Sequence, residues 1–328
     1  MRVLLTGAFG NIGSATLEEL LRRGHAVRCF DLRSSANERA ARRLGRGAEV
    51  VWGDLRHPED VAAAVEGQDA VVHLAFVIPT LSATGRSSED YPAWAREVNV
   101  GGTQNLVAAL AARPRPARLV FVSSLHVYGL TQDLPPPRTV HETPRPVEHY
   151  ARHKVECEAM VRESGLAWAI LRLGAALPAR LVLDPGMFAV PLANRIEFVH
   201  RRDVALAIAN ALGSEEVWGR IWLIGGGPRC QLYQRDLVAP VLEAVGVGML
   251  PDSAFTTAPF ATDWLDTAES QRVLDFQRRT LDDYIRDVVD AIGHRRHLIR
   301  LFRPSIRAWM IGLAALRRWR TARAAVGG

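Results

Sequence analysis

The sequence predicts an α/β fold in which helices cover both faces of a doubly wound parallel sheet. Short apolar runs alternate with helical patterns through about the first 225 of the 328 residues, which is the order of repeated strand–helix units. The runs are apolar throughout, as strands buried on both faces require. A composition of 48% hydrophobic and 23% charged residues is typical of a soluble globular protein.

The individual elements follow from where each apolar or periodic run begins and ends. We expect strands over residues 3–7, 26–31, 49–54, 70–76, 118–124 and 168–173. We expect helices over residues 11–23, after 31, and over 58–67, 93–112 and 149–164. Beyond residue 174 the pattern loosens into a strand at 196–200, a helix from Asp203, a strand at 222–227 and further helices. We therefore expect a cofactor-binding core over 1–173, a smaller substrate lobe over 174–293 interleaved with the last sheet elements, and a tail over 294–328.

The cysteines and the charge distribution bear on the cellular compartment and on whether the protein binds metal or nucleic acid. Cys29, Cys157 and Cys230 are far apart and match no metal-ligand spacing, so we expect no metal site and three reduced, apolar side chains in a cytoplasmic protein. The first residues lack the pattern of a signal peptide. The net charge of +6 comes from residues 291–328, which hold nine arginines and no acidic residue, while the rest carries 32 basic and 35 acidic residues. A general nucleic-acid-binding surface is therefore not indicated.

The segment TGAFGNIG predicts a dinucleotide site. Gly7, Gly10 and Gly13 are spaced three apart between a strand and a helix. The first glycine permits the turn, the second lets the backbone approach a pyrophosphate, and the third allows close packing of helix on strand. The N–H groups and dipole of the helix start then bind the phosphates. The alternative is an ordinary glycine turn.

Three charged residues bear on which dinucleotide is bound. Asp31 ends the second strand, where a carboxylate accepts hydrogen bonds from ribose hydroxyls and repels a 2′-phosphate, so NAD is favoured over NADP. Arg33 would bind that phosphate if its side chain turned inward. Asp54 is a candidate for binding the adenine amino group, or else a helix cap for the segment near Pro58.

A serine, a tyrosine and a lysine form the candidate catalytic group. Tyr150 and Lys154 are four apart on an expected helix and so share one face. We expect the lysine ammonium to lower the pKa of the phenol, giving an acid or base that works near neutral pH. Ser123 and Ser124 end the strand 118–124, where such folds bind ligands, and a hydroxyl there can polarise a substrate oxygen.

Two further features flank this group. Asn99 lies in the expected helix 93–112, where its amide would hold a water or a backbone kink near Lys154, or lie on an exposed face. Residues 133–148 hold five prolines and form either a border of the substrate pocket or a rigid surface connection.

Taken in order, these motifs resemble a known superfamily. TGAFGNIG, Asp31, GDL at 53–55, HLA at 73–75, NVGGTQNL from Asn99, SSLHVYG from Ser123, Tyr150 with Lys154, LRL at 171–173 and FVHRRDVA from Phe198 are similar to the extended short-chain dehydrogenase/reductases, the NAD-dependent epimerase/dehydratase family with a Rossmann fold. The resemblance covers roughly residues 1–290. It is specific for the superfamily and poorly specific for the substrate.

The resemblance implies roles for individual residues. It selects Ser124 as the catalytic serine, Tyr150 as general acid/base, Lys154 as the residue that binds the nicotinamide ribose, and Asn99 as the family asparagine. The implied cofactor site comprises Gly7, Gly10, Asn11, Ile12, Gly13, Asp31, Arg33, Asp54, Leu55, Leu74, Ala75 and Lys154. The resemblance also implies a homodimer through the helices near 93–112 and 149–164, and structural roles for His200 and Asp203.

The sequence departs from nucleotide-sugar epimerases at one place. Those enzymes have an asparagine shortly after the LR of the sixth strand, where Gly174 and Ala175 stand here, which argues against a sugar-nucleotide substrate. We interpret His126 as a loop residue rather than a second base, and Glu142 as a surface carboxylate rather than a dehydratase acid.

The tail predicts an amphipathic helix starting at Pro304. Arg300, Arg303, Arg307 and Arg318 fall within about 60° of one another on an ideal helix, and Leu298, Trp309, Leu313 and Leu316 group on the other side. Its longest uncharged run, nine residues, is too short to span a bilayer. The helix either lies on an anionic membrane surface or packs on the protein's own core or a partner subunit with its arginines solvated.

Two classes of function remain. The first is an NAD(P)-dependent enzyme acting on a carbinol or carbonyl carbon through hydride transfer at nicotinamide C4, as a dehydrogenase or reductase, or alternatively as an NAD-retaining epimerase or dehydratase. The second is a non-catalytic NAD-binding scaffold, which the presence of both Tyr150 and Lys154 disfavours.

Overall fold

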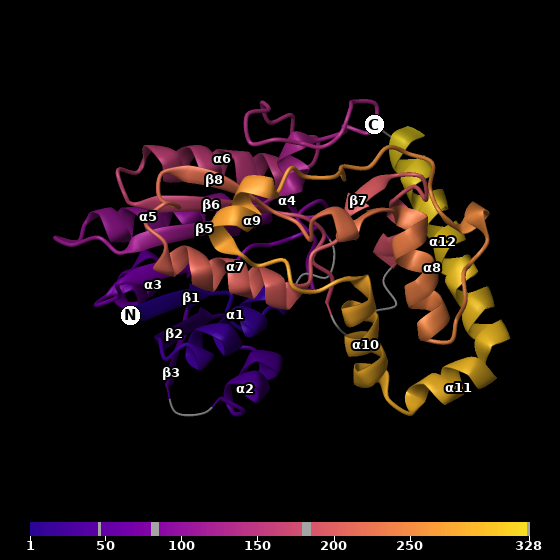
Figure 1. The fold of residues 1–328 in the computed structure, drawn as a ribbon, viewed down its shortest axis with the longest axis horizontal. Helices are drawn as coiled ribbons and strands as arrows, with labels where there is room; N and C mark the ends of the chain where they lie inside the picture. Colours follow the sequence, from indigo (N-terminus) through magenta and orange to yellow (C-terminus); the bar gives the residue numbers. More distant parts are fainter. Residues whose placement is uncertain (45–46, 80–84, 179–184, 327–328) are drawn as a thin grey trace.

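The predicted doubly wound α/β fold is confirmed. The computed structural model describes residues 1–44, 47–79, 85–178 and 185–326, without the side chains of 185 and 317–326. A seven-stranded parallel sheet runs in the order β3-β2-β1-β4-β5-β6-β8 (Figure 1). Its strands are β1 (Arg2–Thr6), β2 (Ala26–Asp31), β3 (Ala48–Trp52), β4 (Ala70–His73), β5 (Arg118–Ser124), β6 (Trp168–Leu173) and β8 (Arg220–Ile224).

Helices bury both faces of this sheet, which explains why most positions of its strands are apolar. On one face Leu17 and Leu20 of α1 (Asn11–Arg22) and Val204 of α7 (Arg201–Gly213) pack on alternate strand residues such as Leu5. On the other face Leu4 packs with side chains of α3 (Pro58–Val65), α5 (Gly102–Ala111) and α6 (His149–Glu163). Of two short helices, α2 (Ser35–Ala41) lies at the edge of the molecule near β3, and α9 (Ala268–Leu274) lies beside α7 and β8. The three cysteines are free and fully buried.

The expected helix 93–112 is one continuous helical segment with a local irregularity. It begins as α4 (Pro92–Arg96), widens into a π-helical turn, η1 (Glu97–Gly101), and continues as α5. Such turns occur frequently at functional sites. The expected strand 70–76 is also wrong at its end: β4 stops at His73, because the N–H groups of Leu74 and Ala75 turn to donate to Thr6 Oγ1.

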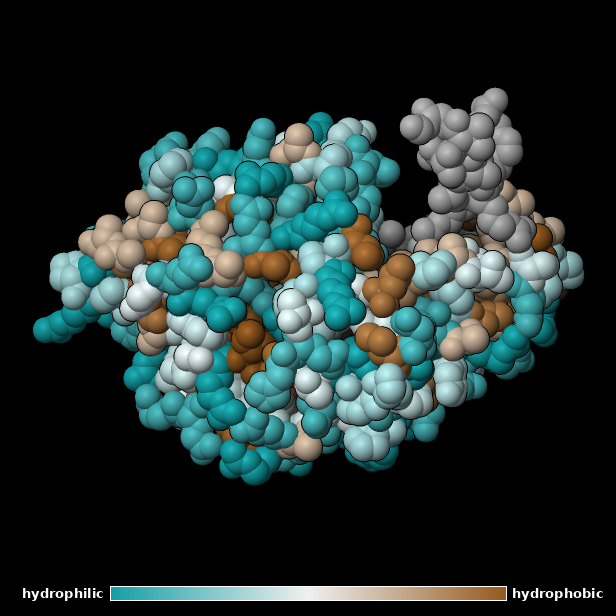
Figure 2. Space-filling model, turned by 90° about the horizontal axis from the view of Figure 1, so that it is seen from above, coloured by the Kyte–Doolittle hydropathy of each residue, from teal (hydrophilic) through white to brown (hydrophobic). Residues whose placement is uncertain are grey.

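A second cluster of buried side chains lies beyond the carboxyl ends of the strands (Figure 1). The predicted strand 196–200 is shorter, β7 (Arg195–Glu197), and pairs with β9 (Gln231–Tyr233) as an antiparallel ribbon separate from the main sheet. This part of the chain also contains three 3-10 turns and four helices. The turns are η3 (Pro185–Ala189), η4 (Pro228–Cys230) and η5 (Asp252–Ala254), and the helices are α8 (Gln234–Ala244), α10 (Leu281–Ile292), α11 (Arg295–Leu301) and α12 (Arg303–Val326). From above, hydrophobic side chains gather where this lobe, on the right, meets the sheet-bearing part (Figure 2).

The C-terminal segment is helical as expected, but its orientation corrects the prediction. Arg303 and Arg307 point inward, donating to the carbonyls of Val247, Gly248 and Met249 that follow α8. Met310 and Ala314, on the same face, are buried. The arginine side therefore packs on the protein, whereas the predicted apolar side, with Leu298, Trp309 and Leu316, is exposed. The side chain of Arg318 lies outside the described residues. Among the described residues, no helix combines the length and apolarity that a bilayer span needs.

Candidate active site

The glycine loop between β1 and α1 is shaped as a phosphate cradle. Gly7 has φ +68°, and a Cβ there would lie 2.8 Å from Ala75 N. A Cβ on Gly13 would lie 2.0 Å from Gly7 O, so only glycine lets α1 approach the loop this closely. No side chain caps the start of α1, which leaves N–H groups of its first turn free for an anion. Asn11 Nδ2 donates to Ala176 O beyond β6 at 3.1 Å, and Ile12 packs into the core beneath.

Asp31 lies beside this loop, whereas Arg33 does not reach it. Phe9 N donates to Asp31 Oδ2 at 3.0 Å, and Leu32 N and Asn37 Nδ2 donate to Oδ1. Burial raises the pKa of Asp31, and these donors oppose the shift. Arg33 is largely exposed and pairs with Glu38 at 2.8 Å.

Asp54 and Leu55 follow β3 at the same edge of the sheet. Arg56 binds Asp54 through its backbone N–H and its guanidinium, which holds the pKa of this carboxyl below its usual range although burial opposes it. Asp54 is not the cap of α3, because the capping position is His57. Leu55 is buried, and its carbonyl accepts a 2.8 Å hydrogen bond from Asn105 of α5.

A chain of buried polar groups fixes the segment after β4. Thr6 Oγ1 lies 2.7 Å from His73 Nδ1, and His73 Nε2 lies 3.1 Å from Thr103 Oγ1, which donates to Asn99 O. Burial lowers the pKa of His73 to about 3, so its ring is neutral. The Asn99 amide in turn binds both the N–H and the carbonyl of Val77, at 2.7 and 3.0 Å. Asn99 is fully buried, so the exposed alternative is wrong, and its amide holds backbone rather than lying at the surface.

The segment fixed in this way connects the glycine loop to Tyr150 and Lys154. Ala75 touches the loop at Gly7, and the next residue, Phe76, packs edge-on against Tyr150 with ring centroids 5.8 Å apart. Lys154 Nζ lies 3.4 Å above the Phe76 ring. The carboxyl ends of β1, β4 and β5 thus bring the loop and the catalytic candidates to one edge of the sheet, where strand order reverses at β1 and β4.

Ser124, Tyr150 and Lys154 lie together, and the two serines point in different directions. Ser124 is near enough to Tyr150 to act against the rise in the pKa of its hydroxyl, and Lys154 Nζ donates to Val122 O at 2.6 Å. Ser123 instead points to the other side of β5, where its Oγ donates to Glu158 at 2.5 Å. Glu158 also forms a buried ion pair with Arg172.

The expected lowering of the Tyr150 pKa is wrong for the protein's own side chains. Burial raises the pKa of Tyr150 to about 12, and Ser124 only partly opposes this. Lys154 Nζ is 5.8 Å from the Tyr150 ring centroid and points at Val122 O. Burial among aromatic rings lowers the pKa of Lys154 itself to about 7. In the protein alone the phenol is therefore protonated and suited to donate a proton.

The contact between His126 and Tyr150 could not be expected from the sequence motifs alone. The His126 ring lies edge-on to Tyr150 and to Phe260, at centroid distances of 5.8 and 5.7 Å, and its Nδ1 is 2.8 Å from Glu148. Its place two residues after Ser124, near the carboxyl end of β5, was the available signal. Glu142, by contrast, pairs with Arg138 and accepts from Thr139 N, as a partly exposed structural carboxylate.

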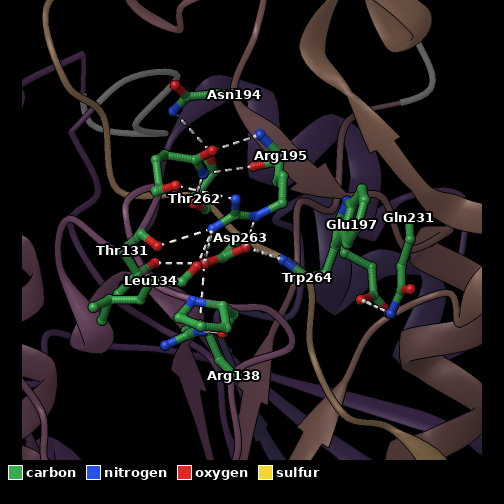
Figure 3. Close-up of polar contacts among 12 residues, drawn as sticks. Thr131, Leu134, Arg138, Asn194, Arg195, Glu197, Gln231, Thr262, Asp263 and Trp264 are labelled. Atoms are coloured by element: carbon green, nitrogen blue, oxygen red, sulfur yellow. Dashed lines mark hydrogen bonds and ion pairs between the residues drawn. The ribbon is translucent and has the colours of Figure 1, made fainter.

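A buried network around Asp263 holds the side of the site on which Phe260 packs against His126 (Figure 3). Asp263 pairs with Arg138 at 3.1 Å and Arg195 at 2.7 Å, and accepts from Thr131 Oγ1. Asn194, next to Arg195, donates to the carbonyl of Phe260 at 3.0 Å. The proline-rich segment is thereby fastened to the lobe, and Phe260 is placed on His126.

The sequence profile of the NAD dependent epimerase/dehydratase family matches residues 3–180, more than half of the chain. The chain belongs to this family. Its relatives include an L-arabinose 1-dehydrogenase (NAD(P)(+)) of Haloferax volcanii, 36% identical over 194 residues, which are 54% of this chain and 68% of the relative. A 3-beta-hydroxysteroid dehydrogenase of Mycolicibacterium neoaurum is 36% identical over 161 residues, 49% of this chain and 42% of the relative, so the chain spans less than half the length of that protein.

Solved structures of the family extend the similarity over nearly the whole chain. The UDP-glucose 4-epimerase of Thermus thermophilus in complex with NAD has a TM-score of 0.69 and 25% identity, covering 89% of this chain and 98% of that one. DesIV, a dTDP-glucose 4,6-dehydratase from Streptomyces venezuelae with NAD bound, has a TM-score of 0.73 for its double mutant at 25% identity, covering 91% and 98%.

Three features of this structure fit NAD, the cofactor of the family. The cradle at Gly7 and Gly10 meets an uncapped helix start, as a pyrophosphate requires. Asp31 Oδ2 accepts one hydrogen bond from the protein and retains a lone pair for a ribose hydroxyl. Lys154 uses one of its three N–H donors on Val122 O, which leaves two for the hydroxyls of the nicotinamide ribose.

Proposed function

We propose that this protein is an NAD-dependent oxidoreductase that interconverts a carbinol and a carbonyl. The observation that carries the proposal is that Ser124 and Tyr150 interact at the carboxyl end of β5, with Lys154 one helical turn further along α6 and bound to Val122 O of the same strand. Ser124 orients the substrate oxygen, and Tyr150 gives or takes its proton. NAD, when bound, supplies the hydride acceptor or donor at nicotinamide C4.

The remaining candidate residues bind and position. We assign the cofactor contacts to the cradle, Asp31, Asp54, Leu55, Leu74, Ala75 and Lys154, with Arg33 as the residue that would serve NADP. NAD is favoured because the Asp31 carboxylate faces the loop while Arg33 is paired with Glu38. Asn99 acts as a positioning residue, since its amide fixes the backbone beside Phe76. Asp31→Ala should weaken NAD binding at least tenfold and Arg33→Ala by less than twofold in calorimetric titration; equal losses would contradict the NAD preference.

An apolar carbinol fits the site better than a sugar nucleotide. The rings of Phe76 and His126 pack edge-on against Tyr150, and Phe260 packs on His126. Arg138 and Arg195 are both paired with Asp263, so neither offers a free charge to a diphosphate. Gly174 and Ala175 occupy the place of the epimerase asparagine.

An NAD-retaining epimerase or dehydratase is the second candidate, favoured by the similarity to solved enzymes of both kinds. The test is a panel of dehydroepiandrosterone, L-arabinose and UDP-glucose with added NAD. NADH formation with the steroid supports the proposal. NAD that stays bound through purification, with conversion of UDP-glucose and no net NADH, would replace it with the second candidate. NAD binding without turnover of any of the three would favour a non-catalytic scaffold.

We further propose the organisation of the chain and its assembly. The core of 1–173, the substrate lobe of 174–293 and the segment 294–328 are the expected divisions. A cytoplasmic homodimer would form through the neighbouring helices α5 and α6, and free, buried cysteines suit a reducing compartment. A monomeric mass in light scattering would contradict the dimer.

We also propose that α11 and α12 contact anionic membrane surfaces. Leu301 is 71% exposed, Phe302 55% and Trp309 50%, in a segment that carries nine arginines and no acid. Because Met310 belongs to the core, truncation would expose buried surface, so substitution is the better test. The double variant Leu301→Gln, Trp309→Gln should lose co-sedimentation with phosphatidylserine vesicles, while Leu130→Gln, at an exposed leucine elsewhere, should keep it. Equal sedimentation of all three proteins would end the membrane proposal.

A further inference from the structure

His126 and Glu148 form an ionisable pair that the proposed reaction does not use. Their Nδ1 and Oε2 atoms are 2.8 Å apart, and the side chains are 20% and 21% exposed. Both residues adjoin the catalytic candidates in sequence and in space: His126 follows Ser124 by two residues, and Glu148 precedes Tyr150 by two.

The pairing fixes which nitrogen of His126 can accept a proton. A carboxylate accepts a hydrogen bond from the ring nitrogen that faces it. Glu148 therefore favours the tautomer with the proton on Nδ1 and the lone pair on Nε2. A carboxylate that orients an imidazole in this way also stabilises the imidazolium formed when Nε2 takes up a proton. The pair is thus built as an acid–base group.

The ring is held in place next to the substrate oxygen. His126 N donates to Ser124 Oγ at 3.2 Å, within the tight turn η2 (Leu125–Tyr128). Phe260 packs on the ring from the lobe, and Tyr150 from α6, with interplanar angles of 86° and 85°. The substrate carbon next to the carbonyl carbon, two bonds from the oxygen held by Ser124 and Tyr150, would therefore lie near this imidazole.

Packing alone does not explain the residue types. A phenyl ring would make the same edge-on contacts without needing a carboxylate partner. The carboxylate suits a ring that takes up and releases a proton.

We propose that His126, oriented by Glu148, is a second acid–base group of this site and moves a proton at the carbon next to the substrate carbonyl. The inference rests on the proposed function, which generates that carbonyl. Nε2 removes the proton from the α carbon, the C–H electron pair becomes a C=C bond, and the carbonyl π pair moves to the oxygen held by Ser124 and Tyr150. Return of a proton from Nε2 restores the ketone, so the step needs no oxidant or reductant.

The experiment follows NADH and isotope exchange together. Wild-type protein with NAD and dehydroepiandrosterone, or whichever carbinol of the panel gives NADH, is run in D2O, and deuterium at the carbon next to the new carbonyl is measured by mass spectrometry. Against the spontaneous exchange of the ketone, wild type should accelerate deuteration. His126→Gln should lower the accelerated rate at least a hundredfold, with NADH formation within tenfold of wild type.

Two variants complete the design. Glu148→Gln keeps the ring packing and should lower deuteration about tenfold, which serves if His126→Gln is poorly folded. His149→Gln is the control, because the ring of this neighbouring histidine packs against His153. It should match wild type in both readouts.

The possible outcomes separate the two claims. NADH formation without deuteration above the spontaneous rate overturns this inference and leaves the proposed function standing. An equal fall of both rates in His126→Gln makes His126 a positioning residue and also overturns it. Absence of both reactions in wild type removes the proposed function and this inference with it.

Discussion

Replacing Asp263 by asparagine tests whether the network of Figure 3 holds the lobe together. The substitution keeps the shape and removes one charge from a site where the side chains of Asp263, Arg138 and Arg195 are 1%, 3% and 14% exposed. Breaking a buried ion pair by removing one partner costs about 3–5 kcal/mol. Because Arg138 retains Glu142, and the amide oxygen of the new side chain would still accept from Thr131, we expect the lower end, about 3 kcal/mol, which is more than a hundredfold in the folded-to-unfolded ratio.

Urea unfolding followed by tryptophan fluorescence measures this loss. Asp252→Asn is the matched control, since it removes the same charge from an exposed pair with Arg235 and should cost less than about 1 kcal/mol. If Asp263→Asn were no less stable than Asp252→Asn, the network would not be what fastens the proline-rich segment and Phe260 to the lobe.

Three further predictions concern the site. Tyr150→Phe should lower turnover about 10²–10⁴-fold and leave NAD affinity, measured by calorimetry, within twofold; unchanged turnover would remove Tyr150 from the mechanism. Ser124→Ala should lose turnover with stability retained, while Ser123→Ala should keep turnover and lose about 1–3 kcal/mol because Glu158 loses a buried donor; the reverse result would exchange their roles. Since the pKa of Lys154 falls from 10.5 to about 7 on folding, the unfolded chain binds more protons between these values, and stability should rise with pH there and not below pH 7. Urea midpoints at pH 6 to 9.5 should show this rise for wild type relative to Lys154→Met, and parallel curves would refute it.

The sheet could be predicted because its strands are buried on both faces. Residues 26–31, 118–124 and 168–173 coincide with β2, β5 and β6, since a mostly apolar run in a parallel sheet ends near the place where burial ends. The end of β4 could not, because Leu74 to Phe76 are as apolar as the strand and the side chain of Thr6, far away in sequence, turns their backbone aside.

Of the site, the sequence predicted which residues meet but not their electrostatics. The spacing of Tyr150 and Lys154 determines that they share a helix face, whereas the direction of the ammonium depends on Val122 O, a backbone atom that no side-chain pattern reveals. The contacts of His126 were not predicted for a similar reason: its partners Glu148 and Phe260 are 22 and 134 residues away in sequence. The tail was misjudged because helical periodicity distinguishes two sides of a helix but not which one meets a lobe whose carbonyls accept from arginine.

The π turn at Glu97–Gly101 has a consequence for how the chain tolerates deletions. Such a turn contains one residue more than an α-helical turn. The wider turn absorbs the extra residue, so removing Val98 would return the helix to regular i→i+4 pairing and leave α4 and α5 nearly in place. The change would fall on the turn itself, which contains Asn99, the residue whose amide binds Val77. The surplus residue therefore bears on the backbone beside the site and not on the packing of the flanking helices.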